Sequence, residues 1–520
     1  MPCAYLLLLY AREKKRWPCL EVRVIDVLTM APKKKRVLDI RPNATYLSAR
    51  GYGLDITDAN TELIAELRGL LTVKPRVNPS MPNADDVKPF PVFRESTSKF
   101  YVPRAFGLER FGPPLVDRLH DGEDAPNLVF AGLLRPEQDA PVNAFLDSAR
   151  DRSRGGGIIN LGCAAGKTVT SLYIACALGK KTLVICHKDF LMNQWRERIT
   201  QFVPTARVGI IKQAKVQIDA DIVLASLQSL AMREYPADLI ATFGLCIIDE
   251  CHRVAAEVFS RALPKVTARV MMGLSATLDR KDGLRKVIEM FLGPPVFSKK
   301  REDTQMRVRM VKYYDENPAY SRERLMFNGK RNIAQMVTAL TEYKPRNEVI
   351  LQELGTIFET EPERQIMILS DRRLHLKLLA REIEQRFQRT VGFYVGGMKQ
   401  ADLDISATKN VVLATNSMAS EALDIPSLNT LFLVTPLSTV EQQVGRIQRQ
   451  KPSERKYIPL TVDIWDDFSI FKTQGIRRIQ FYKKNGYDVV HNTQDACDVA
   501  TSDDDAKPNT LPQFESDDSE

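Results

Sequence analysis

A run of small residues beside a lysine and a threonine forms the first segment of the chain able to bind phosphate. It lies between the apolar pair Ile158-Ile159 and a helix-like stretch at Ser171–Leu178. This strand–loop–helix order is what a phosphate-binding loop requires, because backbone N–H groups then face phosphates at a helix N-terminus. The loop departs from the common pattern, since Leu161 stands where its first glycine would be. We expect the lysine to reach the β and γ phosphates of ATP and the threonine to hold Mg²⁺. The loop comprises Gly162, Cys163, Ala164, Ala165, Gly166, Lys167 and Thr168.

A second segment suited to the same chemistry lies roughly 80 residues further on. Asp249-Glu250-Cys251-His252 follows the apolar run Leu245–Ile248, which reads as a buried strand. A carboxylate at the C-terminal end of a parallel strand can meet Mg²⁺, and we expect this role for Asp249. The neighbouring Glu250 is suited to orient and polarise an attacking water. Each segment alone has an ordinary alternative, a chance match or a strand that ends in surface charges. Together, in this order, they predict an ATP hydrolase that uses Mg²⁺.

The elements that must position these residues follow an alternating pattern. Between residues 128 and 300, apolar runs such as Thr182–Cys186 and Val270–Leu274 alternate with amphipathic stretches, and the alternation resumes after residue 345. Fully apolar strands separated by helices predict parallel sheets covered on both faces. We therefore predict an α/β fold with two parallel-sheet lobes in tandem. The predicted domains are an N-terminal α/β accessory domain (1–127), lobe 1 (128–300), a charged helical connector (301–345), lobe 2 with a closing helix (346–494) and a disordered acidic tail (495–520).

With these two segments the chain resembles superfamily 2 helicases of the DExH class, over about residues 130–490. The resemblance implies RecA-like lobes that close on ATP and step along a nucleic-acid strand. It implies that His252 links the ATP site to the strand path, and that Gln138, at the end of Leu134–Gln138, contacts the adenine base. A coupling motif between ATP hydrolysis and strand movement is matched by Ser275, Ala276 and Thr277. Two further segments resemble the motifs of lobe 1 that contact the nucleic-acid strand. They are Lys181–His187 with Gln194-Trp195, and Ile222–Leu227.

The second half of the chain resembles the later helicase motifs. Arg446 and Arg449 fall three residues apart, on one face of a predicted helix. The resemblance implies that they cross the cleft to the γ-phosphate as arginine fingers, whereas an isolated pair would read as surface arginines. It also implies that Asp424 belongs to the ATP site. The matching segments are Ile366–Asp371, Ala414–Asn416, Glu421–Ile425 and Gln442–Arg449.

A closer similarity is to the XPB-type branch, which includes transcript-release and repair helicases of large DNA viruses. Cys163, Phe393–Met398 and Asp466–Phe471 carry this match. It implies DNA as the track, movement from 3′ to 5′, and a setting in viral transcription or repair. The Arg-Glu-Asp that supports unwinding in that branch is replaced here by Arg280-Lys281-Asp282, so strand separation by that device is not implied.

Charge and targeting signals bear on partners and location. The whole chain has a net charge of +9, and residues 495–520 have a net charge of −8. The rest of the chain therefore has a net charge of +17. A body this basic favours a nucleic-acid partner, although a solvated basic surface is the alternative. No apolar stretch approaches the roughly 18–20 residues that span a bilayer, and we expect no membrane partner. We expect an intracellular protein, in host nucleus, cytoplasm or virion, and Pro32–Val37 reads either as a nuclear-import signal or as a basic strand edge.

Alternatives remain for the function and for two segments. The track could be RNA, the motor could remodel DNA complexes without unwinding, or the chain could be a non-hydrolysing scaffold, against which Lys167, Glu250 and Arg446 argue. Residues 477–484 interleave aromatic and basic side chains, as in a helix on nucleic acid or an amphipathic helix that closes lobe 2. Transcription or repair proteins are further candidate partners, and the acidic tail is either a docking peptide for them or a solubilising segment.

Overall fold

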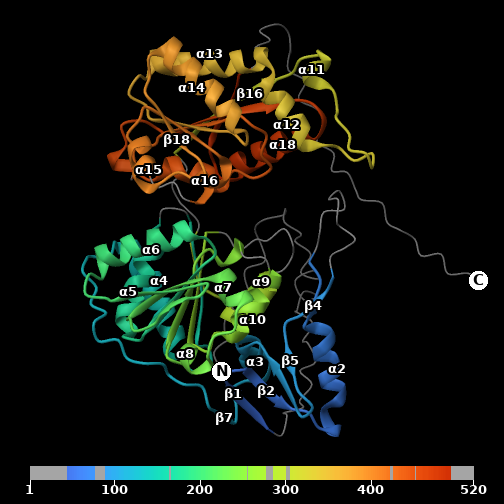
Figure 1. Cartoon of the computed structure of the whole chain (residues 1–520), viewed down its shortest axis with the longest axis vertical. Coiled ribbons are helices and arrows are strands. Elements are labelled where there is room, and N and C mark those ends of the chain that lie inside the picture. Colours follow the sequence, from blue (N-terminus) through green and yellow to red (C-terminus); the bar gives the residue numbers. More distant parts are fainter. Residues whose placement is uncertain are drawn as a thin grey trace, which may run out of the picture.

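The computed structural model describes most of the chain between residues 44 and 492 (Figure 1). Several sequence expectations lie outside the described residues, namely the basic run at 32–37, Arg280–Asp282 and the acidic tail. None of the described helices is long and apolar enough to cross a membrane. The described ranges are 44–75, 88–162, 165–253, 256–276, 285–299, 305–421, 425–450 and 452–492.

The N-terminal unit is a small α/β fold, drawn in blue in Figure 1. Its five-stranded sheet has the order β5-β6-β2-β1-β7, antiparallel except for the β1–β7 pair, and a short β3–β4 pair lies apart. Strand β2 places Tyr52 and Leu54 in the core. The elements are β1 (Thr45–Ser48), β2 (Gly51–Asp55), η1 (Asp58–Asn60), α2 (Thr61–Leu70), β3 (Thr72–Val73), β4 (Phe90–Pro91), β5 (Arg94–Glu95), β6 (Lys99–Val102), α3 (Arg104–Phe111) and β7 (Val116–Asp117).

Lobe 1 is an eight-stranded sheet of order β11-β10-β12-β9-β13-β14-β8-β15. All its pairings are parallel except β10–β11, and its central strands are buried along their whole length, as the apolar runs predicted. Its strands are β8 (Gly156–Leu161), β9 (Thr182–Cys186), β10 (Val208–Lys212), β11 (Lys215–Gln217), β12 (Ile222–Ser226), β13 (Leu245–Ile248), β14 (Val270–Ser275) and β15 (Pro295–Lys299). Its helices are α4 (Pro136–Arg150), α5 (Lys167–Leu178), α6 (Asp189–Phe202), α7 (Leu227–Met232), α8 (Ala237–Ala241), η2 (Cys251–Arg253), α9 (Ala256–Ala262), η3 (Leu263–Lys265) and α10 (Arg285–Leu292).

Lobe 2 is a seven-stranded sheet of order β18-β19-β17-β20-β21-β16-β22, in which every pairing is parallel. The prediction of two α/β lobes with parallel sheets is confirmed. Its strands are β16 (Arg307–Tyr313), β17 (Ile366–Leu369), β18 (Val391–Tyr394), β19 (Val411–Ala414), β20 (Thr430–Leu433), β21 (Leu460–Asp466) and β22 (Asp488–Asn492). Its helices are α11 (Pro318–Ser321), α12 (Ile333–Glu342), α13 (Lys344–Thr360), α14 (Arg373–Phe387), α15 (Gln400–Ala407), α16 (Asn416–Glu421), α17 (Glu441–Val444), η4 (Gly445–Gln448), η5 (Pro452–Glu454) and α18 (Ser469–Lys484).

The segment expected to be a helical connector belongs to lobe 2 instead. Residues Arg307–Tyr313 form β16, which pairs with β21 on one side and β22 on the other. The prediction of a connector was wrong because Arg307, Arg309 and Lys312 make the segment look charged throughout. Between them, Val308, Met310 and Val311 are buried, so the strand is amphipathic, and it lies next to the edge strand β22.

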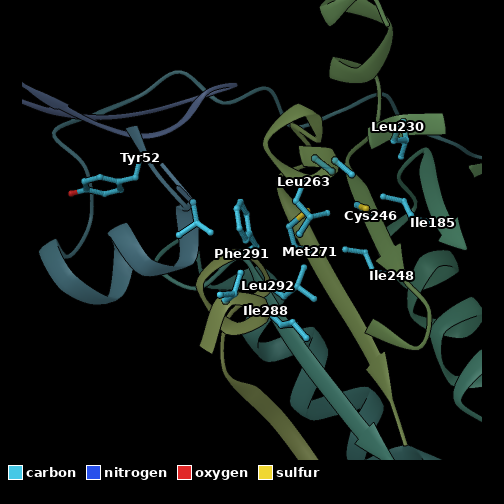
Figure 2. Packing of buried hydrophobic residues seen from close by; sticks show 14 of the residues in the cluster. Tyr52, Ile185, Leu230, Cys246, Ile248, Leu263, Met271, Ile288, Phe291 and Leu292 are labelled. Atoms are coloured by element: carbon cyan, nitrogen blue, oxygen red, sulfur yellow. The ribbon is translucent and has the colours of Figure 1, made fainter. Parts of the chain in front are cut away.

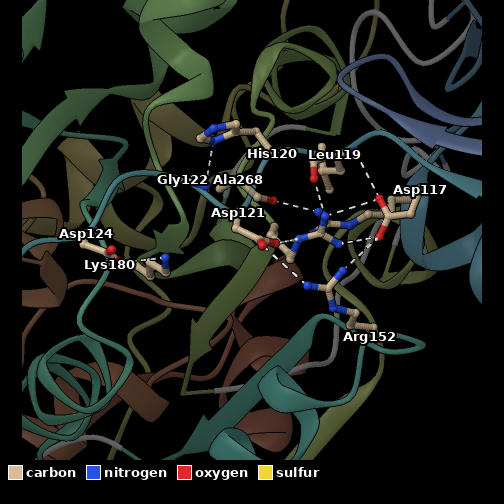
Figure 3. A network of polar contacts seen from close by, with 11 residues as sticks. Asp117, Leu119, His120, Asp121, Gly122, Asp124, Arg152, Lys180 and Ala268 are labelled. Atoms are coloured by element: carbon tan, nitrogen blue, oxygen red, sulfur yellow. Dashed lines mark hydrogen bonds and ion pairs between the residues drawn. The ribbon is translucent and has the colours of Figure 1, made fainter.

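The N-terminal unit and lobe 1 share one apolar core. Tyr52 and Leu54 of β2 belong to the same buried cluster as Met271 of β14 and Phe291 of α10 (Figure 2). A polar network lies beside this core, where Arg269 bridges to Asp117 at 2.7 Å, to Asp121, and to the carbonyl of Leu119 (Figure 3). Burial by packing and a network of paired charges therefore hold the two units together.

Buried charges tie the elements of lobe 2 together. Arg346 of α13 is fully buried and donates to both carboxylate oxygens of Asp466, at 2.6 and 2.9 Å. Arg478 of α18 does the same with Asp463, at 2.8 Å in both bonds. Because Arg478 and Tyr482 are buried, α18 packs on the sheet as an amphipathic helix that closes lobe 2. The basic side chains that it exposes are Lys472, Arg477, Lys483 and Lys484.

Candidate active site

The phosphate-loop segment has the expected strand–loop–helix geometry. Strand β8 ends at Leu161 and helix α5 begins at Lys167, with Gly162, Ala165 and Gly166 in the turn between them. Gly166 has a φ of +78°, and a Cβ there would lie 2.5 Å from the side-chain nitrogen of Gln138. Only glycine fits this position without displacing a neighbour. Thr168 follows in the first turn of α5, whereas Cys163 and Ala164 lie outside the described residues.

Gln138 lies directly against this loop. Its amide nitrogen donates to the carbonyl of Gly166 at 3.2 Å and to the hydroxyl of Thr170 at 3.1 Å. Its amide oxygen accepts from the backbone N–H of Arg135 at 2.9 Å, which caps helix α4. The side chain is only 3% exposed, and its hydrogen bonds link α4 to the phosphate loop. Its contact with adenine stays a prediction.

Asp249 is held at the C-terminal end of β13, next to the loop. Its Oδ2 accepts a hydrogen bond from the indole N–H of Trp195 at 2.9 Å, and its Oδ1 accepts from the backbone N–H of Glu250 at 2.9 Å. Burial, and then the charge of Glu250, raise the pKa of Asp249 to about 6. The hydrogen bond from Trp195 and the charge of Lys167 work against this rise. A buried carboxylate in this position favours a cation beside it.

Glu250 contacts Lys167 of the phosphate loop on one side and His252 on the other. Its backbone has a φ of +47°, a conformation that a non-glycine residue adopts at some cost in energy. Its Oε1 lies 3.5 Å from the ammonium of Lys167, and its Oε2 lies 3.4 Å from Nδ1 of His252. The same Nδ1 is 2.8 Å from the hydroxyl of Ser275 at the end of β14. Ala276 follows Ser275 in the chain, and Thr277 lies outside the described residues.

These contacts form a continuous path from the phosphate loop to the end of β14. It passes through Lys167, Glu250, His252 and Ser275, which lie up to 108 positions apart in the sequence. Strands β8, β14 and β13 are consecutive neighbours in the sheet, so their C-terminal ends meet at one edge. Sheet order therefore brings together the residues of lobe 1 that the sequence had singled out.

The arginines of lobe 2 lie at the face of that lobe nearest α6 of lobe 1. Arg446 lies in the 3₁₀ helix η4 and Arg449 follows it directly, so a spacing of three keeps both on one face. Burial raises the pKa of Tyr394, and the charges of Arg446 and Arg449 oppose this rise. Glu197 of α6 acts on the same tyrosine. Both arginines therefore share the surroundings of Tyr394 with a residue of lobe 1.

Other features of the two lobes extend this picture. Phe190 of α6 packs against apolar residues of lobe 1 and of lobe 2. In lobe 2, Asp371 accepts a hydrogen bond from the side chain of Asn416 at 2.7 Å, which joins two of the segments that resemble later helicase motifs. Asp424 lies outside the described residues.

The sequence interpretation missed the role of Trp195. It grouped Gln194-Trp195 with a strand-contacting motif, but the Trp195 side chain is 1% exposed and bonds to Asp249. The position of Trp195 beside Asp249 depends on the order of the strands in the sheet, which cannot be read from the sequence. Strand β9 pairs with β13, so the helix that follows β9 lies beside the residue that follows β13.

Comparison with known proteins identifies the family of the chain. The family described as "Type III restriction enzyme, res subunit" matches residues 132–280. The chain belongs to the superfamily 2 helicases, and it is therefore an ATP-hydrolysing enzyme that acts on nucleic acid.

Individual relatives come from large viruses and phages. The chain is 32% identical over 453 residues to "Putative ATP-dependent RNA helicase L396" of Acanthamoeba polyphaga mimivirus, covering 86% of both chains. It is 28% identical over 375 residues to "Probable helicase D10" of Escherichia phage T5, covering 69% of this chain and 77% of that protein. Among solved structures, T4 UvsW matches 86% of this chain and 99% of its own at 15% identity, with a TM-score of 0.34.

Proposed function

We propose that this helicase is a Mg²⁺-ATP-driven motor that moves from 3′ to 5′ along DNA. The observation that carries the proposal is the path of contacts from Lys167 through Glu250 and His252 to Ser275. A change at the phosphates alters what Lys167 and Glu250 contact, and their shift reaches the end of β14 within two further contacts. Such a path links nucleotide state to the surface where a strand would lie.

The residues of lobe 1 fit Mg²⁺-ATP. Gly166 forms a left-handed turn against Gln138 where a Cβ would not fit, and burial and the charge of Glu250 raise the pKa of Asp249, so a cation beside its carboxylate would be favourable. Thr168 and Asp249 would hold the ion, which would neutralise charge on the phosphates when bound. Lys167 binds the β and γ phosphates, and Glu250 orients the attacking water.

Lobe 2 completes the site when the lobes close. Arg446 and Arg449 contact the γ-phosphate from the opposite side and stabilise the charge that develops during transfer. Because ATP touches both lobes, it favours the closed arrangement, and hydrolysis releases it. Each cycle would then advance a strand that crosses both lobes.

The choice of DNA rests on the resemblance to the XPB-type branch and on the basic body of the chain, which suits any polyanion. RNA is a second candidate, because the mimivirus relative carries RNA helicase in its name. Grip on the phosphate backbone does not by itself separate the two. We further propose a role in viral transcription or repair, since the relatives named above belong to viruses and phages.

The test is ATP hydrolysis by the purified chain, alone and with single-stranded DNA, duplex DNA or RNA. Lys167→Ala and Glu250→Gln should each abolish the stimulated rate, whereas Lys215→Ala, at an exposed lysine of the edge strand β11, should not. Greater stimulation by RNA than by DNA would overturn the DNA assignment. Strand displacement on duplexes with a 3′ or a 5′ tail then tests the direction of movement.

A further inference from the structure

A cleft of about 110 Å³ lies where the N-terminal unit meets lobe 1, outside the two-lobe motor. The N-terminal unit lines it with the β1–β2 turn, with residues 91–94, and with the end of β6. Lobe 1 contributes Leu263, Thr267, Met271 and Phe291, of which three appear in Figure 2. No part of the motor site described above reaches this cleft.

The cleft is positively charged. Among the described residues, its lining contains three arginines, at positions 50, 94 and 104, and no aspartate or glutamate. Arg104 has a structural role, because it donates a hydrogen bond to the carbonyl of Ala268 at 2.7 Å. Arg50 and Arg94 are exposed and face solvent at the cleft. Glu234 acts on Arg94 from a distance, but its carboxylate is 2.8 Å from Lys265.

Arg50 is held in place by aromatic side chains. Its guanidinium lies 5.8 Å from the ring centroid of Tyr101, and Tyr101 meets the ring of Tyr46 edge-to-face at 6.0 Å. Tyr46 and Tyr101 can meet across β2 because the residue between them is Gly53, where a Cβ would lie 2.3 Å from the Tyr46 ring. A guanidinium stacked in this way loses less conformational freedom when it binds a phosphate.

Thr267, which lines the cleft, has a buried hydroxyl without a hydrogen-bond partner among the described residues. Thr267 is 9% exposed, and its Oγ1 makes no hydrogen bond to any described residue. A buried hydroxyl without a partner is unfavourable, and a ligand with phosphate or sugar oxygens would satisfy it. Phe93 is half-buried, lines the same cleft, and stacks on Phe100 with 4.8 Å between the ring centroids.

The geometry of the cleft is fixed with respect to lobe 1. One apolar core continues from Tyr52 to Phe291, and Arg269 joins both units through Asp117 and Asp121. A ligand bound in the cleft would therefore stay attached to lobe 1 while lobe 2 opens and closes.

We propose that this cleft binds single-stranded nucleic acid. Arg50 and Arg94 bind consecutive phosphates, Thr267 bonds to a phosphate or sugar oxygen, and Phe93 stacks against a base. The proposal extends the function proposed above, because it rests on a nucleic-acid substrate. It gives the N-terminal unit a holding role, since a strand fixed to lobe 1 does not slip when the motor lobes separate.

The test compares Arg50→Ala/Arg94→Ala with Arg68→Ala/Arg110→Ala in the full chain. The control removes the same charge from α2 and α3 of the same unit, where both arginines pair with glutamates. Binding of a fluorescein-labelled single strand is measured by anisotropy at several salt concentrations, without nucleotide. For the cleft variant we expect about tenfold weaker binding, and a slope of log K against log salt that is smaller by about 1.4, from two lost phosphate contacts. The control should bind as the native chain does, and thermal unfolding should be the same for all three.

Photocross-linking with a 5-iodouracil-containing strand locates the contact. Cross-links on the peptide that carries Phe93 support the proposal, and equal affinity of all variants with cross-links confined to the motor lobes overturns it. Binding of a peptide of residues 495–520 to the cleft, with strand affinity unchanged in the variant, would also overturn it, because the occupant would be acidic protein. If the native chain hydrolyses no ATP while the cleft variant still loses affinity, the proposed motor fails and the cleft stands.

Discussion

The indole N–H of Trp195 donates to Oδ2 of Asp249 at 2.9 Å, and both side chains are almost fully buried. Trp195 lies on α6, and the first turn of that helix also carries Phe190, which packs against both lobes. One helix therefore contacts the carboxylate proposed to hold Mg²⁺ and the surface of the other lobe. This makes Trp195 a positioning residue that acts through Asp249.

Replacing Trp195 by Phe should weaken Mg²⁺-dependent nucleotide binding. The ring keeps most of the apolar packing but loses the N–H, and hydrogen bonds to charged groups contribute about 1.5–3 kcal/mol. We expect about a tenfold higher Mg²⁺ concentration for half-saturation, measured with a fluorescent ADP analogue. Trp465→Phe is the matched control, because the indole N–H of Trp465 makes no hydrogen bond to a described residue. An equal effect of both substitutions would show that Trp195 acts only through packing.

Replacing Ser275 by Ala should separate ATP hydrolysis from strand movement. The hydroxyl lies 2.8 Å from His252, and its loss leaves the contact between Glu250 and Lys167 intact. One hydrogen bond of about 1 kcal/mol corresponds to roughly a fivefold change, which we expect in the rate of strand displacement. The ATPase rate without nucleic acid should change by less than about twofold, since the lost hydrogen bond goes to His252, outside the phosphate loop. A parallel fall in both rates would place Ser275 in the hydrolysis step itself.

The sequence predicted the parts of the molecule that local pattern encodes. Apolar runs of four to six residues identified the central strands of both sheets, and the small residues around Gly166 identified a turn that a Cβ would block. The proximity of Lys167 and Glu250 followed from parallel-strand geometry alone.

The parts that the sequence did not predict depend on which strands are neighbours. Strand β16 looked like a charged connector, since its burial comes from β21 and β22, which lie 153 and 181 positions later in the chain. Trp195 looked like a strand-contacting residue, because nothing local says that α6 lies beside the end of β13. The shared core of Tyr52 and Phe291 likewise joins residues far apart in the chain.

Replacing Asp466 by Asn should strongly destabilise lobe 2. Arg346 is fully buried and would keep its charge with no carboxylate beside it, and removal of one partner of a buried pair costs about 3–5 kcal/mol. The loss can be measured in urea by hydrogen exchange of the β21 amides. Glu348→Gln, which breaks the exposed pair with Arg386, should cost no more than about 1 kcal/mol. A loss for Asp466→Asn as small as that of the control would mean that water reaches Arg346.

Lobe 2 should become less stable as the pH is lowered, because of His375. Its Nδ1 is 3.0 Å from the hydroxyl of Ser370 and its Nε2 is 3.0 Å from Oδ1 of Asn347, an acceptor. Nε2 therefore donates to Asn347, and Nδ1 accepts from Ser370 when the ring is neutral, as it is in the fold at pH 7. Burial, and then the charge of Arg346, lower its pKa to about 3 from a usual value of 6.5.

The sign follows from which state takes up the proton. Above pH 6.5 neither state binds it, whereas below that value the unfolded chain does and the folded one does not until about pH 3. His375 should therefore remove about 2 kcal/mol of stability between pH 7 and pH 5. Urea unfolding at both pH values, compared with His375→Gln, isolates this contribution. The variant should be less stable at pH 7 but lose less on acidification, and an identical loss in both proteins would show that the ring is protonated in the fold.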